Sequence, residues 1–550
     1  MPRHTYTPRA TGITPERRAQ WLARHTTPLD LDEEANHIHA YIEALLAVDN
    51  WDRQASYDHL VRQMGREGRP TYSKAVLRRA YLRLVAAGAL PHNPVVLSRL
   101  RTRPVRTASG IVPISVMVEP APCPGKCIFC PTDTRMPKSY LSNEPAGQRA
   151  LTLQFDPYAQ TRQRIMALQA IGHTVDKVEL IVLGGTWSSY PRDYQTWFVR
   201  RMFDARNDSE SASLEEAHMR NETARHRSTG LVIETRPDCI TVEEIRHLRR
   251  LGVTRVQIGL QSTDDGILSL NKRGHTVEEV RRAVRMLRGA GFKITLHWMP
   301  NLFGATPESD RADFARLWSD PGLRPDELKI YPTGLLRGTE LYALYEKGHY
   351  QPYSEEALTR LQADCLAQVP EYCRVNRVMR DIPAPEIVEG TRTSNLRQIV
   401  EQRLNEQGRP SRDIRSREVR YQQVDDVTIQ RLDYTTDHSR EVFLSAVTPG
   451  DRLAAFLRLS LPDGESVLAE LANTALIRQV QVYGPTRAIG ADAGGAAQHQ
   501  GLGTTLINQA LAAAGAAGYA SAAVIAAVGT RPYYRRFGFE TEGLYMVRRA

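Results

Sequence analysis

Cysteine is scarce in this sequence, and its scarcity excludes the small disulfide-rich folds of secreted proteins. Six of 550 residues are Cys, too few for a disulfide scaffold. Long apolar runs are missing too, since none approaches the roughly 20 residues that a membrane-spanning helix needs. The first residues, MPRHTYTPRATG, lack the apolar core of a signal peptide. We therefore expect a cytoplasmic protein with no membrane partner.

Basic residues are in moderate excess. Lys and Arg number 72 against 62 Asp and Glu, which gives a formal net charge of +10. The excess is greatest before residue 108. A basic surface attracts polyanions such as nucleic acid, with an affinity that falls steeply as salt rises. A solvated basic face would have the same composition, so charge alone leaves both interpretations open.

The length predicts two to four domains, because one hydrophobic core does not serve 550 residues. Apolar residues spaced three and four apart, including Ile38, Tyr41 and Leu45, predict a small basic helical domain over residues 1–100. Residues 382–425 are polar and rich in Arg and Pro, which predicts a linker. We expect α/β domains on either side of it, at 101–381 and 426–550.

Apolar strand candidates alternate with helical stretches in the first of these domains. The candidates are residues 111–118, 178–185, 231–237, 255–262, 292–300, 327–332 and 374–381. Repeated strand–helix units predict a parallel, partial TIM-type (β/α) barrel, in which chemistry lies at the carboxyl ends of the strands. Polar residues and glycines gather at those ends: Gly184, Gly185, Glu234, Gln261, His297, Lys329 and Tyr331.

Three of the six cysteines fall within eight residues. Cys123, Cys127 and Cys130 have the spacing C-x3-C-x2-C, directly after a strand candidate. Three thiolates can hold a 4Fe-4S cluster and leave one iron open to chelate a substrate. The spacing resembles that of radical S-adenosylmethionine (SAM) enzymes, in which the open iron binds SAM. A zinc site without its fourth ligand and unrelated thiols are the alternatives.

Residues after the neighbouring strands are candidates for SAM contacts. Gly184, Gly185 and Thr186 follow one strand and would let the backbone approach the methionine moiety closely. Glu234 and Gln261 end the next two strands as candidate ribose or carboxylate contacts. A glycine pair after a strand is often only a turn, so this interpretation depends on the cysteine motif that precedes it.

The second α/β domain carries a glycine motif between a strand and a helix. Its strand candidates are residues 442–447, 452–461, 476–484 and 522–528, with a helix from about 502. The stretch from Gln498 to Gly503 fits Q/R-x-x-G-x-G/A, the signature of GNAT acetyltransferases, and offers backbone amides to a pyrophosphate. Tyr533 and Tyr534 follow the last strand, where a tyrosine of this fold contacts the leaving thiol; core aromatics are the alternative.

Several stretches together closely resemble the family of the catalytic subunit of Elongator. They are VRTASGIVPISVMVEP, TVDKVELIVLGGTW, ETRPD, IGLQS, NKRGHT, KIYPTGLLRGTELY, VYGP, QHQGLG and AVGTRPYYRRFGF. The likeness covers residues 100–550. That family joins a radical SAM domain to a GNAT domain and modifies the wobble uridine of transfer RNA.

The resemblance implies a mechanism and a set of contacts. A 5′-deoxyadenosyl radical from SAM would take hydrogen from the acetyl methyl of acetyl-CoA, the carbon radical would add to uridine C5, and thioester hydrolysis would leave 5-carboxymethyluridine. Lys177 matches a family residue associated with acetyl-CoA, although it could be a solvated charge. The remaining CoA contacts would be Gln479, Val480, Gln481, Val482, Gln498, Gly501, Leu502, Gly503, Thr504 and Tyr534, with Lys177, Tyr533 and Tyr534 as catalytic candidates.

One departure from the family concerns zinc. Many relatives have Cys at the position of Ser411, and Ser411 and Ser416 are poor zinc ligands. We therefore predict that zinc is absent and that hydrogen bonds hold residues 382–425.

The expected partners are the anticodon loop of transfer RNA and an electron donor, with the chain acting as a homodimer or alone, without other Elongator subunits. Phosphate contacts are predicted at Arg101, Arg103, Arg106, Arg412, Arg415 and Arg417, each of which could also be an ordinary surface charge.

Two other functions remain open. In the first, the chain is a protein lysine acetyltransferase with a structural cluster, but Gln479 and Gln481 leave its expected strand without a carboxylate base. In the second, it is a nucleic-acid-binding scaffold without turnover.

Overall fold

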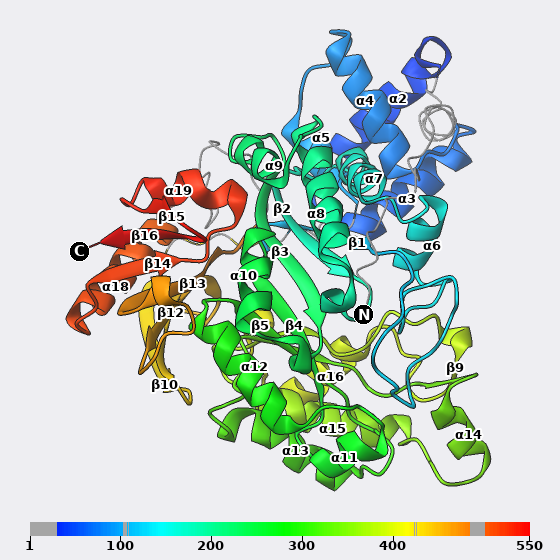
Figure 1. Ribbon diagram of the computed structural model, residues 1–550. Helices are drawn as coiled ribbons and strands as arrows, with labels where there is room; N and C mark the ends of the chain where they lie inside the picture. The colour runs from blue at the N-terminus through cyan, green and yellow to red at the C-terminus, as the bar shows by residue number, and fades with distance from the viewer. Residues whose placement is uncertain are drawn as a thin grey trace.

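The computed structural model describes residues 30–102, 107, 109–422, 424, 426–484 and 501–549. Figure 1 shows three parts: a helical N-terminal part, a central parallel sheet covered by helices, and a C-terminal part built on a second sheet. No helix in the described ranges combines the length and the apolar character needed to cross a membrane.

The N-terminal part is a bundle of short helices. They are α2 (Leu31–Leu46), α3 (Arg53–Arg66), α4 (Lys74–Ala86) and α5 (Pro94–Arg99). Its core is separate from the rest of the molecule and includes Ile38, Tyr41, Leu45 and Leu77. The three- and four-residue spacing places these side chains on one face of each helix, where they are removed from water together.

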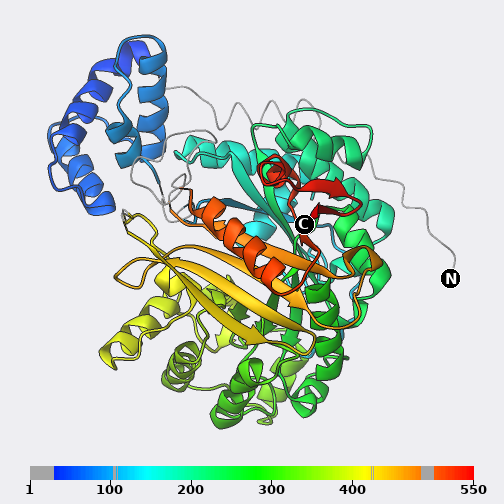
Figure 2. The same ribbon diagram turned by 90° about the vertical axis from the view of Figure 1, so that its left-hand side faces the viewer.

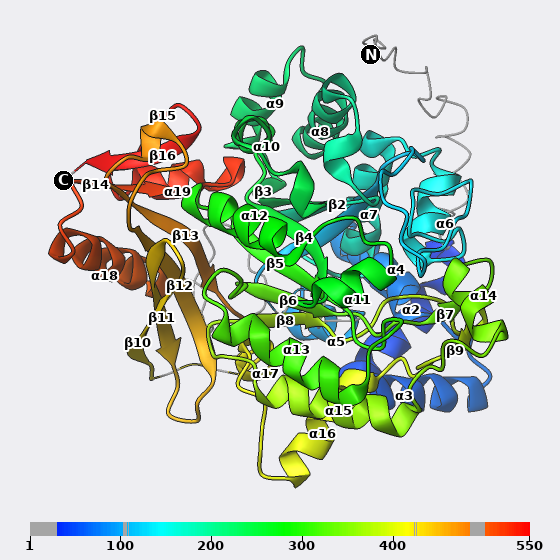
Figure 3. The same cartoon turned by 60° about the horizontal axis from the view of Figure 1, so that its bottom comes forward.

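The central sheet confirms the predicted partial barrel. Its seven strands are all parallel, in the order β1-β2-β3-β4-β5-β6-β8, and the sheet is open rather than closed into a ring. The strands are β1 (Val112–Met117), β2 (Lys177–Leu183), β3 (Arg227–Thr235), β4 (Arg255–Gln261), β5 (Lys293–Trp298), β6 (Glu327–Ile330) and β8 (Arg374–Arg377). Figure 3 shows β2 to β6 and β8 side by side.

Helices follow the strands and bury their apolar faces against the sheet. They are α6 (Pro145–Thr152), α7 (Pro157–Ala170), α8 (Arg192–Asn207), α9 (Leu214–Asn221), α10 (Val242–Arg250), α11 (Asp265–Leu270), α12 (Val277–Gly289), α13 (Pro307–Ser319), α14 (Glu340–Glu346) and α15 (Glu355–Ala367). In α12, Val280, Ala283, Val284 and Leu287 are buried at helical spacing, and Thr276 with Glu279 forms a capping box at its start.

Residues 382–425 are not the linker that their composition predicted. They form β9 (Ile387–Glu389), which pairs with β7 (Leu335–Leu336), and the helices α16 (Leu396–Glu406) and α17 (Ile414–Arg417). Leu396, Val400 and Leu404 lie in the main core. The polar residues between them concealed this stripe, because a helix needs only one apolar face to pack.

The C-terminal part is a mixed sheet with a helix across it (Figure 2). Its order is β10-β11-β12-β13-β14-β16-β15. The strands are β10 (Thr428–Thr435), β11 (Ser439–Val447), β12 (Leu453–Pro462), β13 (Thr474–Val482), β14 (Ser521–Val524), β15 (Glu540–Glu542) and β16 (Tyr545–Arg549); the helices are α18 (Leu502–Ala516), α19 (Arg531–Arg535) and the short 3-10 helix η6 (Val528–Thr530).

The C-terminal part is packed tightly against the barrel. A Cβ on Gly529 of η6 would stand 2.6 Å from the backbone nitrogen of Ser228 at the start of β3. Glu222 pairs with Arg531 at 3.3 Å and with Arg535 at 2.6 Å. At the centre of the contact, Arg478 of β13 pairs with Asp326, the residue before β6, at 2.6 Å. These contacts fix β13 relative to the barrel strands.

Candidate functional sites at opposite ends of the barrel sheet

The segment between β1 and α6, residues 118–144, carries the three cysteines and is called the cysteine segment. It begins at the carboxyl edge of the parallel sheet. Backbone bonds hold it there: the amide of Ile128 donates to the carbonyl of Asn271 at 3.3 Å, and the amide of Leu341 donates to the carbonyl of Ile128 at 2.9 Å. Phe129 packs with Ile128 in a small apolar cluster. The loop is therefore anchored between two of its three cysteines.

Cations and a hydroxyl surround the thiols. The Arg273 guanidinium donates to Cys127 Sγ at 3.5 Å, and Thr186 Oγ1 lies 3.7 Å from Cys123 Sγ. A Cβ on Gly125 would stand 3.6 Å from Cys123 Sγ, 3.8 Å from Cys127 Sγ and 3.1 Å from Arg236 Nη1. Such cations favour thiolates and offset the negative charge of a thiolate-bound cluster.

The three thiols do not converge on one point. In the described parts of the chain, no three His, Cys, Asp or Glu side chains converge on a point that could hold a single metal ion. In a 4Fe-4S cube each thiolate binds a different iron, so its ligands need not converge. Burial, together with the charge of Cys127, raises the pKa of Cys130 to about 11, so that metal binding must compensate for its ionisation.

The glycine pair after β2 has a packing role. Gly184 and Gly185 have φ of 142° and 74°, in the region that favours glycine. A Cβ on Gly184 would stand 2.1 Å from Cγ2 of Val118, and one on Gly185 would stand 3.3 Å from the carbonyl oxygen of Lys138. These close approaches to the cysteine segment account for both glycines. The prediction that they contact SAM stays a prediction.

Two further candidates lie at the same edge. The carboxylate of Glu234 accepts hydrogen bonds from Tyr140 at 3.0 Å and from Lys329 at 3.2 Å, so it joins the cysteine segment to β6. Gln261 has φ of 75°, and its buried Oε1 has no hydrogen-bond partner among the described residues. A buried acceptor without a partner is costly, and a bound ligand donating to it would remove that cost.

Polar side chains cross the concave face between the two edges of the sheet. Arg255 of β4 pairs with Glu179 of β2 at 2.9 Å and with Glu327 of β6 at 3.2 Å. These strands are not neighbours; Gly230 on the intervening β3 leaves the space, since a Cβ there would stand 3.1 Å from Glu179 Oε1. One ion-pair network therefore links β2, β4 and β6 across the sheet.

Lys177 lies at the amino edge, at the opposite end of the sheet from the cysteines. It is the first residue of β2, whose seven residues span about 20 Å at roughly 3.3 Å per residue. Burial lowers its pKa, and Asp176 opposes that shift. The backbone carbonyl of Ser109, ahead of β1, accepts from Gln481 Nε2 at 2.8 Å. Lys177 and β13 therefore share this edge.

The strand β13 has an open side. It pairs in parallel with β14 only from Thr474 opposite Ser521 to Ile477 opposite Val524, yet it continues to Val482. On its other side, Gln479 to Val482 pair with β12. Beyond Ile477, the side facing β14 has no strand neighbour among the described elements. Backbone amides there can pair with an extended amide-containing ligand.

The helix α18 begins at the open side with uncapped amides. Gly501 is its N-cap, with φ of 81° and no side-chain cap, and Leu502, Gly503 and Thr504 form the first turn. Unpaired amides and the helix dipole favour an anion here. The hydroxyl of Tyr533 approaches closely, because a Cβ on Gly503 would stand 2.6 Å from it. Gln498 lies outside the described residues.

Tyr534 is 8% exposed and lies beside Tyr533, with ring centroids 5.5 Å apart. Burial raises the pKa of both hydroxyls. Both are therefore neutral proton donors near neutral pH. The two tyrosines follow η6, which packs against β3.

The predicted phosphate-binding arginines have different environments. Arg417 is 4% exposed and pairs with Glu371 at 3.1 Å and Asp451 at 2.6 Å, while Arg415 donates to the carbonyl of Asn376 at 2.5 Å. Because Arg417 is buried and has two carboxylate partners, the prediction that it binds phosphate does not fit the structure, whereas for Arg415, which donates to one carbonyl only, it stays a prediction. Arg412 also pairs with Glu371 and Asp451 but is exposed. Arg101 is half-buried and donates to Gly172; Arg103 and Arg106 lie outside the described residues.

Hydrogen bonds hold the segment around the two serines. Ser411 Oγ donates to the carbonyl of Leu366 at 3.1 Å, and Ser416 Oγ donates to Asp413 Oδ1 at 2.6 Å. Arg397 pairs with the same carboxylate at 2.8 Å. The absence of zinc stays a prediction.

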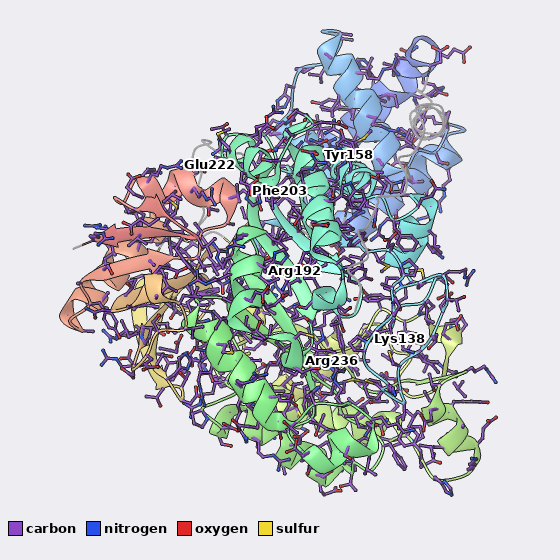
Figure 4. All side chains as sticks on the ribbon, viewed as in Figure 1. Lys138, Tyr158, Arg192, Phe203, Glu222 and Arg236 are labelled. Atoms are coloured by element: carbon purple, nitrogen blue, oxygen red, sulfur yellow. The ribbon has the colours of Figure 1, made fainter. Side chains whose placement is uncertain are left out.

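Sequence reasoning missed the two arginines nearest the thiols. Arg236 follows β3 within ETRPD, and Arg273 follows α11 within NKRGHT (Figure 4 labels Arg236). Figure 4 also shows Lys138 and Arg236 far across the molecule from Glu222, which borders the C-terminal part. The sequence signal that could have found them was a basic residue expected at the carboxyl edge of the sheet, where the cysteine motif also lies.

Comparisons with known proteins identify a radical SAM region in this chain. The Radical SAM superfamily model matches residues 122–317, and the Radical_SAM C-terminal domain model matches residues 325–406. The second match includes α16, in agreement with the core position of that helix.

Similar curated proteins come from archaea, bacteria and animals. The tRNA uridine(34) acetyltransferase of Methanocaldococcus infernus is 40% identical over 469 residues, 82% of this chain and 88% of that protein. The protein of the same name from Dehalococcoides mccartyi is 42% identical over 452 residues, 80% of this chain and 98% of that protein. Elongator complex protein 3 of Homo sapiens is 37% identical over 485 residues, 84% of this chain and 89% of that protein.

A solved structure has the same fold over most of the chain. The archaeal Methanocaldococcus infernus Elp3 with an N-terminus deletion (1-46) has a TM-score of 0.71 and 36% sequence identity. The match covers 81% of this chain and 100% of that one.

Proposed function

Because this chain belongs to the radical SAM family that comprises the tRNA uridine(34) acetyltransferases and Elongator complex protein 3, we propose that it modifies the wobble uridine of transfer RNA with carbon from acetyl-CoA. The proposed product is 5-carboxymethyluridine. The observation that carries this proposal is the presence, in one chain, of a thiol loop at the carboxyl edge of the barrel and, at the amino edge, of an unpaired stretch of β13 near the uncapped start of α18.

The proposed cluster site is the cysteine segment. Cys123, Cys127 and Cys130 would hold a 4Fe-4S cluster, which with bound SAM supplies a 5′-deoxyadenosyl radical. Arg273 keeps a positive charge at Cys127. Gln261 presents a buried acceptor at the same edge, suited to a donor group of the bound cofactor. Glu234 acts indirectly in this scheme, since Tyr140 and Lys329 already occupy its oxygens.

The proposed acetyl-CoA site runs along the open side of β13 to the start of α18, and we call this proposed site the groove. The pantetheine amides would pair with the open side of β13 from Gln479 to Val482, and the pyrophosphate would accept from the amides of Leu502, Gly503 and Thr504. The 5′-deoxyadenosyl radical would take a hydrogen atom from the acetyl methyl, and the resulting carbon radical would bond to uridine C5. The C5–H bond would then break, with loss of its proton and return of one electron to the cluster, and water would cleave the thioester. Tyr534, a neutral proton donor, would protonate the departing thiolate. Lys177 would lie beside the acetyl group.

Transfer RNA would approach the basic N-terminal part and the carboxyl edge, with the target base turned out of its stack to reach the radical. Arg101, Arg415 and the exposed Arg412 remain candidates for phosphate contacts. An electron donor is required for the cluster. We further propose that the protein acts in the cytoplasm without other Elongator subunits.

The main test is an anaerobic assay on the reconstituted holoprotein with SAM, acetyl-CoA, reductant and a transfer RNA that has uridine at position 34. The proposal requires 5′-deoxyadenosine and modified uridine, with acetyl-CoA hydrolysis stimulated by the RNA. Unmodified uridine in a preparation that contains its cluster would refute it. The rival is a protein lysine acetyltransferase; acetylated lysine in a protein substrate at comparable rate, unaffected by Cys127→Ala, would support that rival.

A further inference from the structure

A hollow lies beside the amino end of α18. It has a volume of about 560 Å³ and is lined by Thr504, Asn508, Arg536, Phe537, Gly538 and Arg548. Thr504 and Asn508 lie on the first two turns of α18, and the other residues follow α19 or belong to β16. The hollow therefore adjoins the uncapped amides, on the surface of the C-terminal part.

The two arginines of this hollow differ from the other arginines of the region. Arg531 and Arg535 pair with Glu222, and Arg549 pairs with Glu542 at 2.9 Å. Arg536 and Arg548 are exposed, and neither has a carboxylate partner among the described residues. Arg548 donates to the carbonyl of Phe537 at 3.0 Å, which holds its side chain over the hollow. Two guanidinium groups without an acid are suited to a dianion such as a phosphate monoester.

Aromatic rings connect the hollow to the groove. Tyr533, which touches Gly503 at the start of α18, packs its ring 5.2 Å from that of Phe537. The Arg536 guanidinium lies 5.8 Å from the Tyr533 ring centroid. An aromatic surface next to two cations can bind a planar base that carries phosphate.

We propose that this hollow binds the adenosine 3′-phosphate end of CoA, with Arg536 and Arg548 as the contacts to the 3′-phosphate. The inference rests on the proposed use of acetyl-CoA by the groove, and it adds a subsite that selects full-length CoA. A pyrophosphate on the amides of Leu502 to Thr504 leads into the hollow on one side and into the β13 groove on the other. The 3′-phosphate is the group that CoA has and 3′-dephospho-CoA lacks.

The test compares the binding of CoA and 3′-dephospho-CoA to the full chain by calorimetry. Wild type is expected to prefer CoA at least tenfold. R536Q and R548Q should each reduce that preference several-fold, and the double variant should bind both ligands equally, with dephospho-CoA affinity unchanged. R549Q is the matched control, because Arg549 is next to Arg548 on β16 but pairs with Glu542. The preference of R549Q for CoA over 3′-dephospho-CoA should equal that of wild type.

Other results would overturn the inference in distinguishable ways. Equal wild-type affinity for the two ligands would remove the 3′-phosphate subsite and leave the proposed groove intact. Equal loss of both affinities in R536Q and R548Q would assign the arginines a structural role. Weaker transfer RNA binding with an unchanged CoA preference would make the hollow an RNA contact. No binding of either ligand to wild type would refute the acetyl-CoA groove and this subsite with it.

Discussion

Cys127 is the cysteine whose sulfur accepts directly from a cation, since Arg273 donates to it at 3.5 Å. We expect Cys127→Ala to abolish the iron–sulfur absorption of the reconstituted protein, because two thiolates cannot hold the three protein-bound irons of the cube. The circular dichroism spectrum should be unchanged. Cys239→Ala is the control, since Cys239 lies outside the motif; an intact absorption spectrum in Cys127→Ala would disprove ligation.

The buried His218 should lower the free energy of unfolding as the pH falls. Burial, reinforced by Arg531 and Arg206, lowers its pKa from 6.5 to about 3. Between these values the unfolded chain binds a proton that the folded chain does not, so the free energy of unfolding decreases as pH falls. From pH 6.5 to 5 this amounts to about 2 kcal/mol.

Replacement by leucine should remove this contribution. Urea unfolding at pH 7.5 and at pH 5 measures the effect. Between these two pH values, the free energy of unfolding of His218→Leu should fall by about 2 kcal/mol less than that of wild type. The control is His349→Leu, because His349 is exposed and its replacement should leave the interval unchanged. The same loss in His218→Leu as in wild type would contradict the assignment.

At the scale of elements, the start of α18 depends on the closeness of Tyr533. A Cβ on Gly503 would stand 2.6 Å from the Tyr533 hydroxyl oxygen but 3.7 Å from its Cζ. Gly503→Ala should therefore destabilise the C-terminal part and weaken CoA binding, and adding Tyr533→Phe should restore stability by removing the oxygen. Thermal unfolding and calorimetry measure the two effects.

The double variant separates two roles of this glycine. If CoA affinity stays low while stability recovers, Gly503 also serves the close approach of the pyrophosphate to the backbone. No recovery of stability in Gly503→Ala/Tyr533→Phe would show that the contact with Tyr533 is unimportant. Tyr533→Phe alone is the control for loss of the hydroxyl.

Element boundaries show where sequence patterns are informative. Buried strands such as β4 and β5 were found because both faces of a parallel sheet are apolar or paired. The strand β10 was missed, because it is an edge strand whose residues are mostly exposed. The strand expected at 374–381 is shorter, Arg374–Arg377, since no apolar pattern marks its end.

At the scale of the whole molecule, buried ion pairs hold the two α/β parts together. Arg478 of β13 pairs with Asp326 at 2.6 Å and with Glu441 at 2.8 Å, and all three side chains are at most 1% exposed. Arg458 donates to the carbonyl of Asp326 at 3.1 Å. Charges buried in this way are stable only while every partner is present.

Arg478→Met should therefore leave two carboxylates buried without their main cation. We expect a loss of about 3–5 kcal/mol in unfolding free energy and a lower denaturant midpoint. The double variant Arg478→Met/Asp326→Asn should be less destabilised than the single variant, because one unpaired charge is gone. Arg285→Met, at an exposed pair with Asp437, is the control, with an expected change below about 1 kcal/mol. A midpoint for Arg478→Met that matches this control would contradict the argument.

The sequence by itself determined the thiol motif, the alternation of strands and helices, and the glycine motif at the start of a helix. These depend on local spacing: C-x3-C-x2-C lies within one loop, and period-2 and helical patterns concern neighbours along the chain. The family resemblance then supplied the proposed substrate, because residue spacing alone does not identify one.

Only the tertiary structure decided which residues far apart in the sequence become neighbours. It placed Arg236 and Arg273 at the thiols, placed Val118 and Lys138 against the glycine pair, and showed that Arg417 is already paired with two carboxylates. It also placed Lys177 and the cysteines at opposite edges of the sheet, and the length of β2 separates these edges by about 20 Å. Such contacts join residues far apart in sequence, and their partners are selected by packing and charge in three dimensions, which no local pattern records.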